Sequence, residues 1–268
     1  MMEHDEIKEI LRAYAARPDV LDCTEDALRE LRGHGDDLVP ALLDALKDDP
    51  DEEVRLVVMR LLWEMGTDAE LALPAMINSL KDRNRTIRIA AAGLAARSGE
   101  KAKAAVPILE SWIGSDDKFS RVVAIGHILK IDPTSADELL PLLIDALELE
   151  GMAQLEAICQ LECLGEMATD SVPALKRLLD NADSCVRLAA SDAIHAITND
   201  PVDSIKLGLR LLEADDWMDR YVACEHLGFL GAKAQSAVRR LRWAAIDDES
   251  EAVRNVAGEA FDKIEFGE

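Results

Sequence analysis

The stretch SVPALKRLLDNADSCVRLAASDAIHAI, residues 171–197, has the residue pattern of one complete helical hairpin. A proline stands near its start, where the first turn of a helix does not need the missing N–H. Paired leucines follow at helical spacing, an acidic stretch interrupts them, and Val-Arg then begins a second segment rich in alanine. The stretch therefore predicts two helices joined by a short acidic turn.

The same pattern recurs along the chain with a period of about 33 residues. One column holds arginine at six of seven positions: Arg55, Arg88, Arg121, Gln154, Arg187, Arg220 and Arg254. Prolines precede this column by thirteen to fifteen residues and predict the starts of first helices: Pro40, Pro74, Pro107, Pro141 and Pro173. Glycines recur at a phase that predicts the ends of second helices in left-handed backbone: Gly33, Gly66, Gly99, Gly165 and Gly231.

Composition favours an all-α protein and excludes several classes of partner. Of the 268 residues, 49 % are hydrophobic but 4 % are aromatic, which suits closely packed helices. A net charge of -23 argues against nucleic acid, because binding to phosphate backbones depends on basic residues. The N-terminal residues lack a signal pattern, and the longest uncharged run, residues 71–80, is too short to span a membrane. We therefore expect a soluble cytoplasmic protein with its five cysteines reduced.

The recurring pattern of Asp, Val-Arg, Ala-Ala, Leu-Gly and a closing Gly resembles the HEAT repeat family, in the short variety that bilin lyases share. The resemblance covers residues 36–265 as seven repeats, and residues 1–35 resemble a degenerate helix pair that caps the N-terminal end. It implies a right-handed α–α superhelix in a single domain, residues 1–268. First helices would form the convex layer, and second helices would line the concave side.

The resemblance also implies that each column arginine reaches an acidic residue in the turn of a neighbouring repeat. Six residues before the column, Asp49, Asp82 and Asp248 can fill that role in an ion-pair ladder with the arginines. The fourth unit carries Glu148 at this position, but the third, fifth and sixth units carry Ser115, Asn181 and Ala214, so we expect the ladder to be incomplete.

A row of apolar residues directly after the column predicts a binding groove. In the second helix of the quoted unit, the residues predicted to form the buried stripe are Val186, Ala190, Ile194 and Ile197. At 100° per residue, the residue directly after the arginine points away from that stripe. That residue is apolar or aromatic in six units: Leu56, Ile89, Val122, Leu155, Leu188 and Tyr221. Trp63 and Leu129 join the row seven residues later. The row predicts an exposed surface for a segment of another protein, and the alternative is that it forms part of the core.

The sequence shows no pattern of catalytic residues. Cys159 and Cys163 lie one helical turn apart, with Glu162 between them and His195 one repeat later, but small apolar packing is the more usual role of helical cysteines. We expect no metal and no cofactor. The acidic turns are interpreted as solvated helix ends, with recruitment of a basic partner as the alternative.

These observations favour a non-catalytic scaffold that binds a basic or amphipathic segment of a protein or peptide in its concave groove. The alternative is an enzyme or enzyme accessory, metal-assisted or similar to a bilin lyase, centred on the fourth and fifth repeats. Self-association through the same groove is a third possibility.

Overall fold

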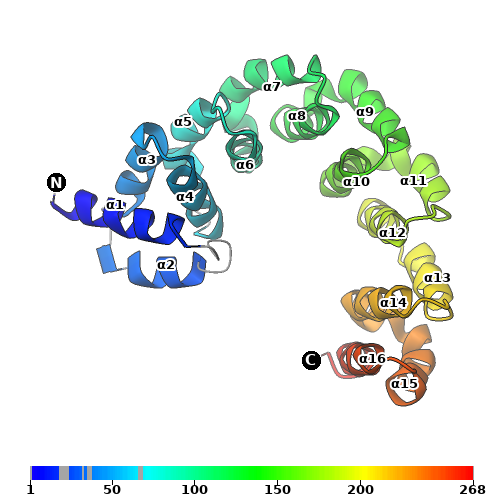
Figure 1. Ribbon diagram of the computed structural model, residues 1–268. Helices are drawn as coiled ribbons and strands as arrows, with labels where there is room; N and C mark the ends of the chain where they lie inside the picture. Colours follow the sequence, from blue (N-terminus) through cyan, green and yellow to red (C-terminus); the bar gives the residue numbers. More distant parts are fainter. Residues whose placement is uncertain (1, 18–23, 32, 35–37, 66–68, 268) are drawn as a thin grey trace. The chain divides into compact units, whose positions relative to one another are not determined.

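The computed structural model describes residues 2–17, 24–31, 33–34, 38–65 and 69–267 (Figure 1). Within these ranges, every regular element is an α-helix or a 3-10 helix, and no strand occurs. The prediction of an all-α fold is confirmed. None of the helices in these ranges is long and apolar enough to span a membrane.

The chain divides into two compact units, residues 1–140 and 141–268, and the division falls within one helix. Unit 1 contains α1 (Met2–Ala15), α2 (Thr24–Leu31), α3 (Leu38–Asp48), α4 (Glu52–Glu64), α5 (Ala69–Ser79), α6 (Arg85–Ala96), α7 (Val106–Ile113) and α8 (Lys118–Ile131). Helix α9 (Ala136–Asp145) crosses the division. Unit 2 continues with α10 (Met152–Leu164), α11 (Val172–Leu178), α12 (Ser184–Thr198), α13 (Val202–Leu211), α14 (Trp217–Leu230), α15 (Val238–Asp247) and α16 (Glu251–Glu265). The single domain proposed from the sequence remains a prediction.

Each repeat is a hairpin of two helices, and the hairpins within a unit stack in two layers (Figure 1). In unit 1, the second helices α4, α6 and α8 contact one another in chain order, and the first helices α3 and α5 contact each other in the other layer. Helices α1 and α2 both contact α4, and α1 also contacts α3, so this pair packs against the first hairpin. In unit 2, α10 contacts α12, and α14 contacts α16.

The acidic turns position the second helices by capping their first turns. Four residues before the column, Asp51, Asn84, Asp117, Asp183 and Asp216 have extended backbone at the N-cap, and each side chain accepts the N–H two residues later. Such a bond satisfies one of the amide donors that a helix N-terminus leaves unpaired. These turn residues therefore define where α4, α6, α8, α12 and α14 begin, whereas α10 and α16 have no side-chain cap.

Positive φ angles end several of the second helices. Gly99, Gly165 and Gly231 have φ of 53°, 56° and 53°, which glycine adopts without the steric penalty of a Cβ. Each begins a short 3-10 segment, η2 (Gly99–Ala105), η5 (Gly165–Ser171) or η6 (Gly231–Ala237), that leads into the next first helix. Gly33 does not have a positive φ, and Gly66 lies outside the described residues.

The prolines mark first helices less uniformly than the sequence suggested. Pro107 and Pro173 stand in the first turns of α7 and α11, as expected. Pro74 and Pro141, in contrast, lie inside α5 and α9, because those helices begin five residues earlier. The apolar faces of both layers meet in a core that, in the last two repeats, includes Leu211, Leu227, Leu241, Val253 and Ala257.

Candidate functional site

The arginine column closes each turn from within its own hairpin. The six arginines donate to the backbone carbonyl six residues upstream, at distances of 2.6 to 3.0 Å. Gln154 has the same role through a bond of 2.7 Å to the carbonyl of Leu147. These carbonyls lie at or just beyond the end of each first helix, where no intrahelical donor remains. The invariant function of the column is therefore to bond the end of the first helix.

The carboxylate ladder between repeats is present at some of the expected positions. Arg55 binds both oxygens of Asp82 at 2.9 and 3.1 Å, and Arg220 binds both oxygens of Asp248 at 2.8 and 3.0 Å. These guanidinium groups hold the pKa values of the two aspartates below their usual range, against the opposing effect of burial. Asp49 is bound by Arg12 of α1 at 3.0 Å, so the N-terminal helix supplies the cation that a preceding repeat would supply.

The ladder changes where the acidic residue is missing. Arg187 binds Asp219 at 3.2 Å, which lies in α14 rather than in the turn where Ala214 stands. Arg88, Arg121 and Arg254 donate to backbone carbonyls, and no carboxylate in the described ranges pairs with them.

The proposed apolar row is not a continuous exposed surface, and two of its members require correction. Val122 is 1 % exposed and Leu129 is 0 % exposed, so neither can contact a partner. The reason is that α8 is apolar around nearly its whole circumference, and such a helix is buried on every side. The other members of the row are half-buried rather than open: Leu56, Ile89, Leu155, Leu188 and Tyr221.

Trp63 lies on α4, in the layer of second helices of unit 1, and is 47 % exposed. Its ring lies 5.2 Å from the guanidinium of Arg97, and its side chain covers Gly93, where a Cβ would come within 3.3 Å of the ring. Trp63 therefore presents one part of its ring to solvent and is held in place by α6.

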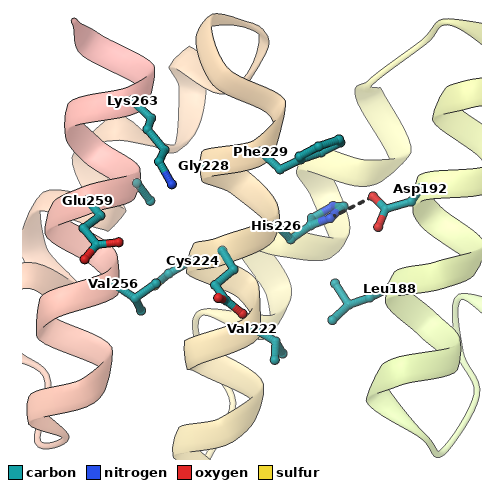
Figure 2. Close-up of a pocket in the computed structure, with 12 residues that line it drawn as sticks. Leu188, Asp192, Val222, Cys224, His226, Gly228, Phe229, Val256, Glu259 and Lys263 are labelled. Atoms are coloured by element: carbon teal, nitrogen blue, oxygen red, sulfur yellow. Dashed lines mark ion pairs between the residues drawn. The ribbon is translucent and has the colours of Figure 1, made fainter. Parts of the chain in front are cut away.

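A pocket of about 470 Å³ lies in unit 2 on the layer of second helices (Figure 2). Its lining comes from three successive repeats through α12, α14 and α16. Leu188, Val222 and Val256 supply apolar surface, and Phe229 is 81 % exposed at its margin. Figure 2 shows Phe229 directed toward α12 and Lys263 directed toward α14. The proposed row thus contributes Leu188 to a real concavity.

Charged side chains of mainly one sign surround this apolar surface. Asp192, Glu225 and Glu259 are acidic, and Lys263 is the basic residue of the lining besides His226. His226 Nδ1 lies 3.0 Å from Asp192 Oδ1, a contact that is an ion pair when the imidazole is protonated, and its Nε2 lies 3.3 Å from the carbonyl oxygen of Ser204. The pocket is therefore suited to an apolar group that carries positive charge beside it.

The candidate metal ligands do not assemble into a site. Cys159 and Cys163 are exposed on α10, while Glu162 and His195 are half-buried. Among the described residues, no group of three or more His, Cys, Asp or Glu side chains is placed to hold a metal ion. Burial, with a smaller effect of the Asp192 charge, raises the pKa of Glu162. His195 Nε2 instead lies 3.1 Å from Lys233 Nζ.

Phe229 and Lys263 of the pocket were not identified from the sequence. Both stand nine residues after their column arginines. On the helix, the position nine residues after the arginine lies to one side of the apolar row and points toward a neighbouring helix. Its exposure therefore depends on the spacing between helices. The signal in the sequence that could have identified them is that Phe229 and Lys263 stand at equivalent positions of adjacent repeats.

Comparison with known proteins supports the repeat assignment. A family model described as HEAT repeats matches residues 39–126. No curated protein matches the sequence significantly. The resemblance to HEAT repeats stated from the sequence is confirmed.

Several solved structures share this fold, and two of them are similar over most of the chain. One is the complex of CpcE and CpcF of phycocyanin lyase from Nostoc sp. PCC7120, with 22 % identity, a TM-score of 0.53 and coverage of 84 % of this chain and 94 % of that chain. The other is YibA of E. coli, with 18 % identity, a TM-score of 0.50 and coverage of 88 % and 85 %. At these identities the similarity shows the HEAT-like fold and nothing of the chemistry.

Proposed function

We propose that this chain is a non-catalytic scaffold, and that the pocket in unit 2 binds a segment of a partner protein. The observation that carries the proposal is the pocket formed by α12, α14 and α16, with apolar surface, an exposed Phe229 and a mainly acidic margin. Stacked repeats commonly use such continuous surfaces for binding proteins.

The chemistry of the lining defines the segment that it would accept. Leu188, Val222 and Val256 favour an aliphatic or aromatic side chain, and Phe229 can add an edge or stacking contact to an aromatic one. Glu225 and Glu259 are exposed and favour arginine or lysine beside that anchor. The partner segment is therefore basic and amphipathic, and its binding is expected to weaken as salt concentration rises.

Selection of short peptides from a random display library on the immobilised protein tests this proposal. Enriched peptides should combine a large apolar residue with arginine or lysine, and they should lose binding to Phe229→Glu and Glu259→Arg. Both side chains are exposed, so the variants should fold. Val202→Glu, which changes an exposed apolar residue on α13 outside the pocket, is the matched control. Enrichment of peptides that bind both pocket variants as well as wild type would refute the proposal.

A second candidate function, that of an enzyme or enzyme accessory with its site in the fourth and fifth repeats, is favoured by one observation. Glu162 of α10 has its pKa raised by burial and by the charge of Asp192 on α12. Carboxyl groups with raised pKa values are frequent at active sites and also occur in structural networks. The similarity to phycocyanin lyase suggests a bilin as the ligand to examine. Visible absorbance of the purified protein after incubation with a bilin, and its loss in Glu162→Gln, would support this candidate over the scaffold.

A further inference from the structure

Helix α15 carries an exposed stripe that differs in charge from the rest of the chain. Arg239, Arg242, Trp243 and Ile246 lie within about 100° of one another on the helix. Trp243 is 59 % exposed and Ile246 is 66 % exposed. Leu241 and Ala244, on the opposite side of α15, are buried in the core with α14 and α16. The stripe is therefore directed away from the body of unit 2.

Comparison with the preceding first helices shows that this stripe replaces a structural contact. Arg177 of α11 and Arg210 of α13 stand 33 residues apart, and each reaches back to an acidic residue of the preceding repeat, Glu148 and Asp180 respectively. One further period leads to Trp243. The equivalent acidic residue, Glu213, pairs instead with Arg240. Because Arg240 makes the contact between repeats, Trp243 has no such role.

Two arginines of the stripe also have no partner of opposite charge. No carboxylate of the described residues pairs with Arg239 or Arg242, although the chain has 53 acidic residues against 30 basic ones. A stripe with two unpaired guanidinium groups beside Trp243 and Ile246 is thus a basic, amphipathic helix face. That is the chemistry that the pocket of unit 2 is suited to accept.

We infer that the stripe of α15 in one copy of this chain docks in the pocket of a second copy. This inference rests on the proposed function, because it uses the same pocket as a docking site. Trp243 would contact Phe229 and the apolar lining, and Arg239 and Arg242 would face Glu225 and Glu259. Lys263 of the lining opposes the arginines, and the carboxylates of Asp192, Glu225 and Glu259 outnumber it. The stripe cannot reach the pocket of its own copy, because its buried face fixes α15 on α16 with the stripe outward.

The contact is heterologous, because one copy contributes the stripe and the other contributes the pocket. A reciprocal pair would use both contacts and close as a dimer, while a single contact per pair would extend as a chain of copies. The net charge of -23 on each copy opposes approach over long distances, so association is expected at about 0.15 M salt, where charges beyond about 8 Å are screened.

Sedimentation velocity of the full chain, over a roughly hundredfold range of protein concentration, tests the inference. The average mass of wild type should rise with concentration, and Trp243→Ala and Arg242→Glu should weaken association by about tenfold or more. Arg177→Glu, which reverses an exposed arginine of another first helix, is the matched control and should associate as wild type does.

Mixing two defective variants gives a result that a folding defect cannot. Arg242→Glu retains an intact pocket, and Glu259→Arg retains an intact stripe, so each alone should associate weakly while the mixture should associate more strongly than either variant. A monomeric wild type at all concentrations, or association that Trp243→Ala and Arg242→Glu leave unchanged, would overturn the inference. Neither stripe variant alters the pocket, so peptide binding by these variants reports on the proposed function separately.

Discussion

Replacing Arg220 with glutamine measures how much the ladder between repeats stabilises unit 2. Arg220 donates to both oxygens of Asp248, and the two side chains are 13 % and 3 % exposed. Without the guanidinium, the Asp248 side chain keeps the N–H of Ser250 as a donor. Breaking a buried ion pair costs about 3–5 kcal/mol, and the remaining exposure and this N–H reduce the expected loss in unfolding free energy to about 2–3 kcal/mol.

Glutamine is chosen because it can preserve the bond to the end of the first helix, as Gln154 does with Leu147. The matched control is Arg254→Gln in the same unit. Arg254 donates to the carbonyls of Asp248 and Glu249 and, within the described ranges, pairs with no carboxylate. Its replacement should therefore cost about 1 kcal/mol, the typical net value of such hydrogen bonds.

The pH dependence identifies the cause of the difference. Arg220 lowers the pKa of Asp248, so the pair stabilises the fold above the ordinary aspartate pKa of about 4, and this stabilisation is lost as the pH falls through the lowered value. Urea denaturation followed by circular dichroism should show that wild type and Arg220→Gln converge as the pH is lowered. Hydrogen exchange of α14 and α16 would locate the loss. Equal losses in the two variants, independent of pH, would refute this reasoning.

Three further predictions concern the interior. Gly208→Ala places a Cβ 2.7 Å from Cγ and Cδ2 of Leu227 and should lower the urea midpoint by an amount equivalent to about 1–3 kcal/mol. Gly258→Ala is the control: no atom lies within 4 Å of the new Cβ, so this variant should raise the midpoint. An unchanged midpoint in Gly208→Ala would contradict the close approach of α13 and α14. Burial lowers the pKa of His127 to about 3, so below about pH 6.5 the unfolded chain takes up a proton that the native state does not. The free energy of unfolding of wild type should therefore decrease as the pH is lowered, and it should decrease less steeply in His127→Gln. An NMR titration midpoint between about pH 5 and pH 7 for native His127 would argue otherwise. Burial raises the pKa of Cys224 to about 12, so a thiol reagent should modify the exposed Cys163 and Cys185 in the native protein and reach Cys224 after unfolding. Peptide mapping of the modified protein would show the order. Comparable modification rates for the three cysteines in the native protein would be inconsistent with the buried position of Cys224.

The sequence predicted the hairpins and their turns because a strict period constrains both. Asp51, Asp117 and Asp183 recur four residues before the column, and a capping side chain acts on its own helix, so local pattern was sufficient. The ladder was partly predictable for the same reason. Arg12 was not found, because it lies outside the period and meets Asp49 through the docking of α1.

The candidate site was predicted less well, because exposure in stacked helices depends on the neighbours. The projection that placed Val122 in solvent assumes one open face on every second helix, and the apolar circumference of α8 removes that face. Leu188 projects into the pocket, but Phe229 and Lys263 project between helices, where the distance to the next repeat decides whether a side chain is open. A period in sequence does not specify that distance.

The arginine bond to the upstream carbonyl begins and ends within one hairpin, and this has a consequence for how such a chain can lengthen. A duplicated hairpin would bring its own turn already closed, whatever residues flank the copy. The carboxylate ladder, in contrast, joins neighbours, and the partial set of ion pairs shows that a hairpin is retained without it. Gene duplication could therefore insert a unit first and refine its ion pairs afterwards.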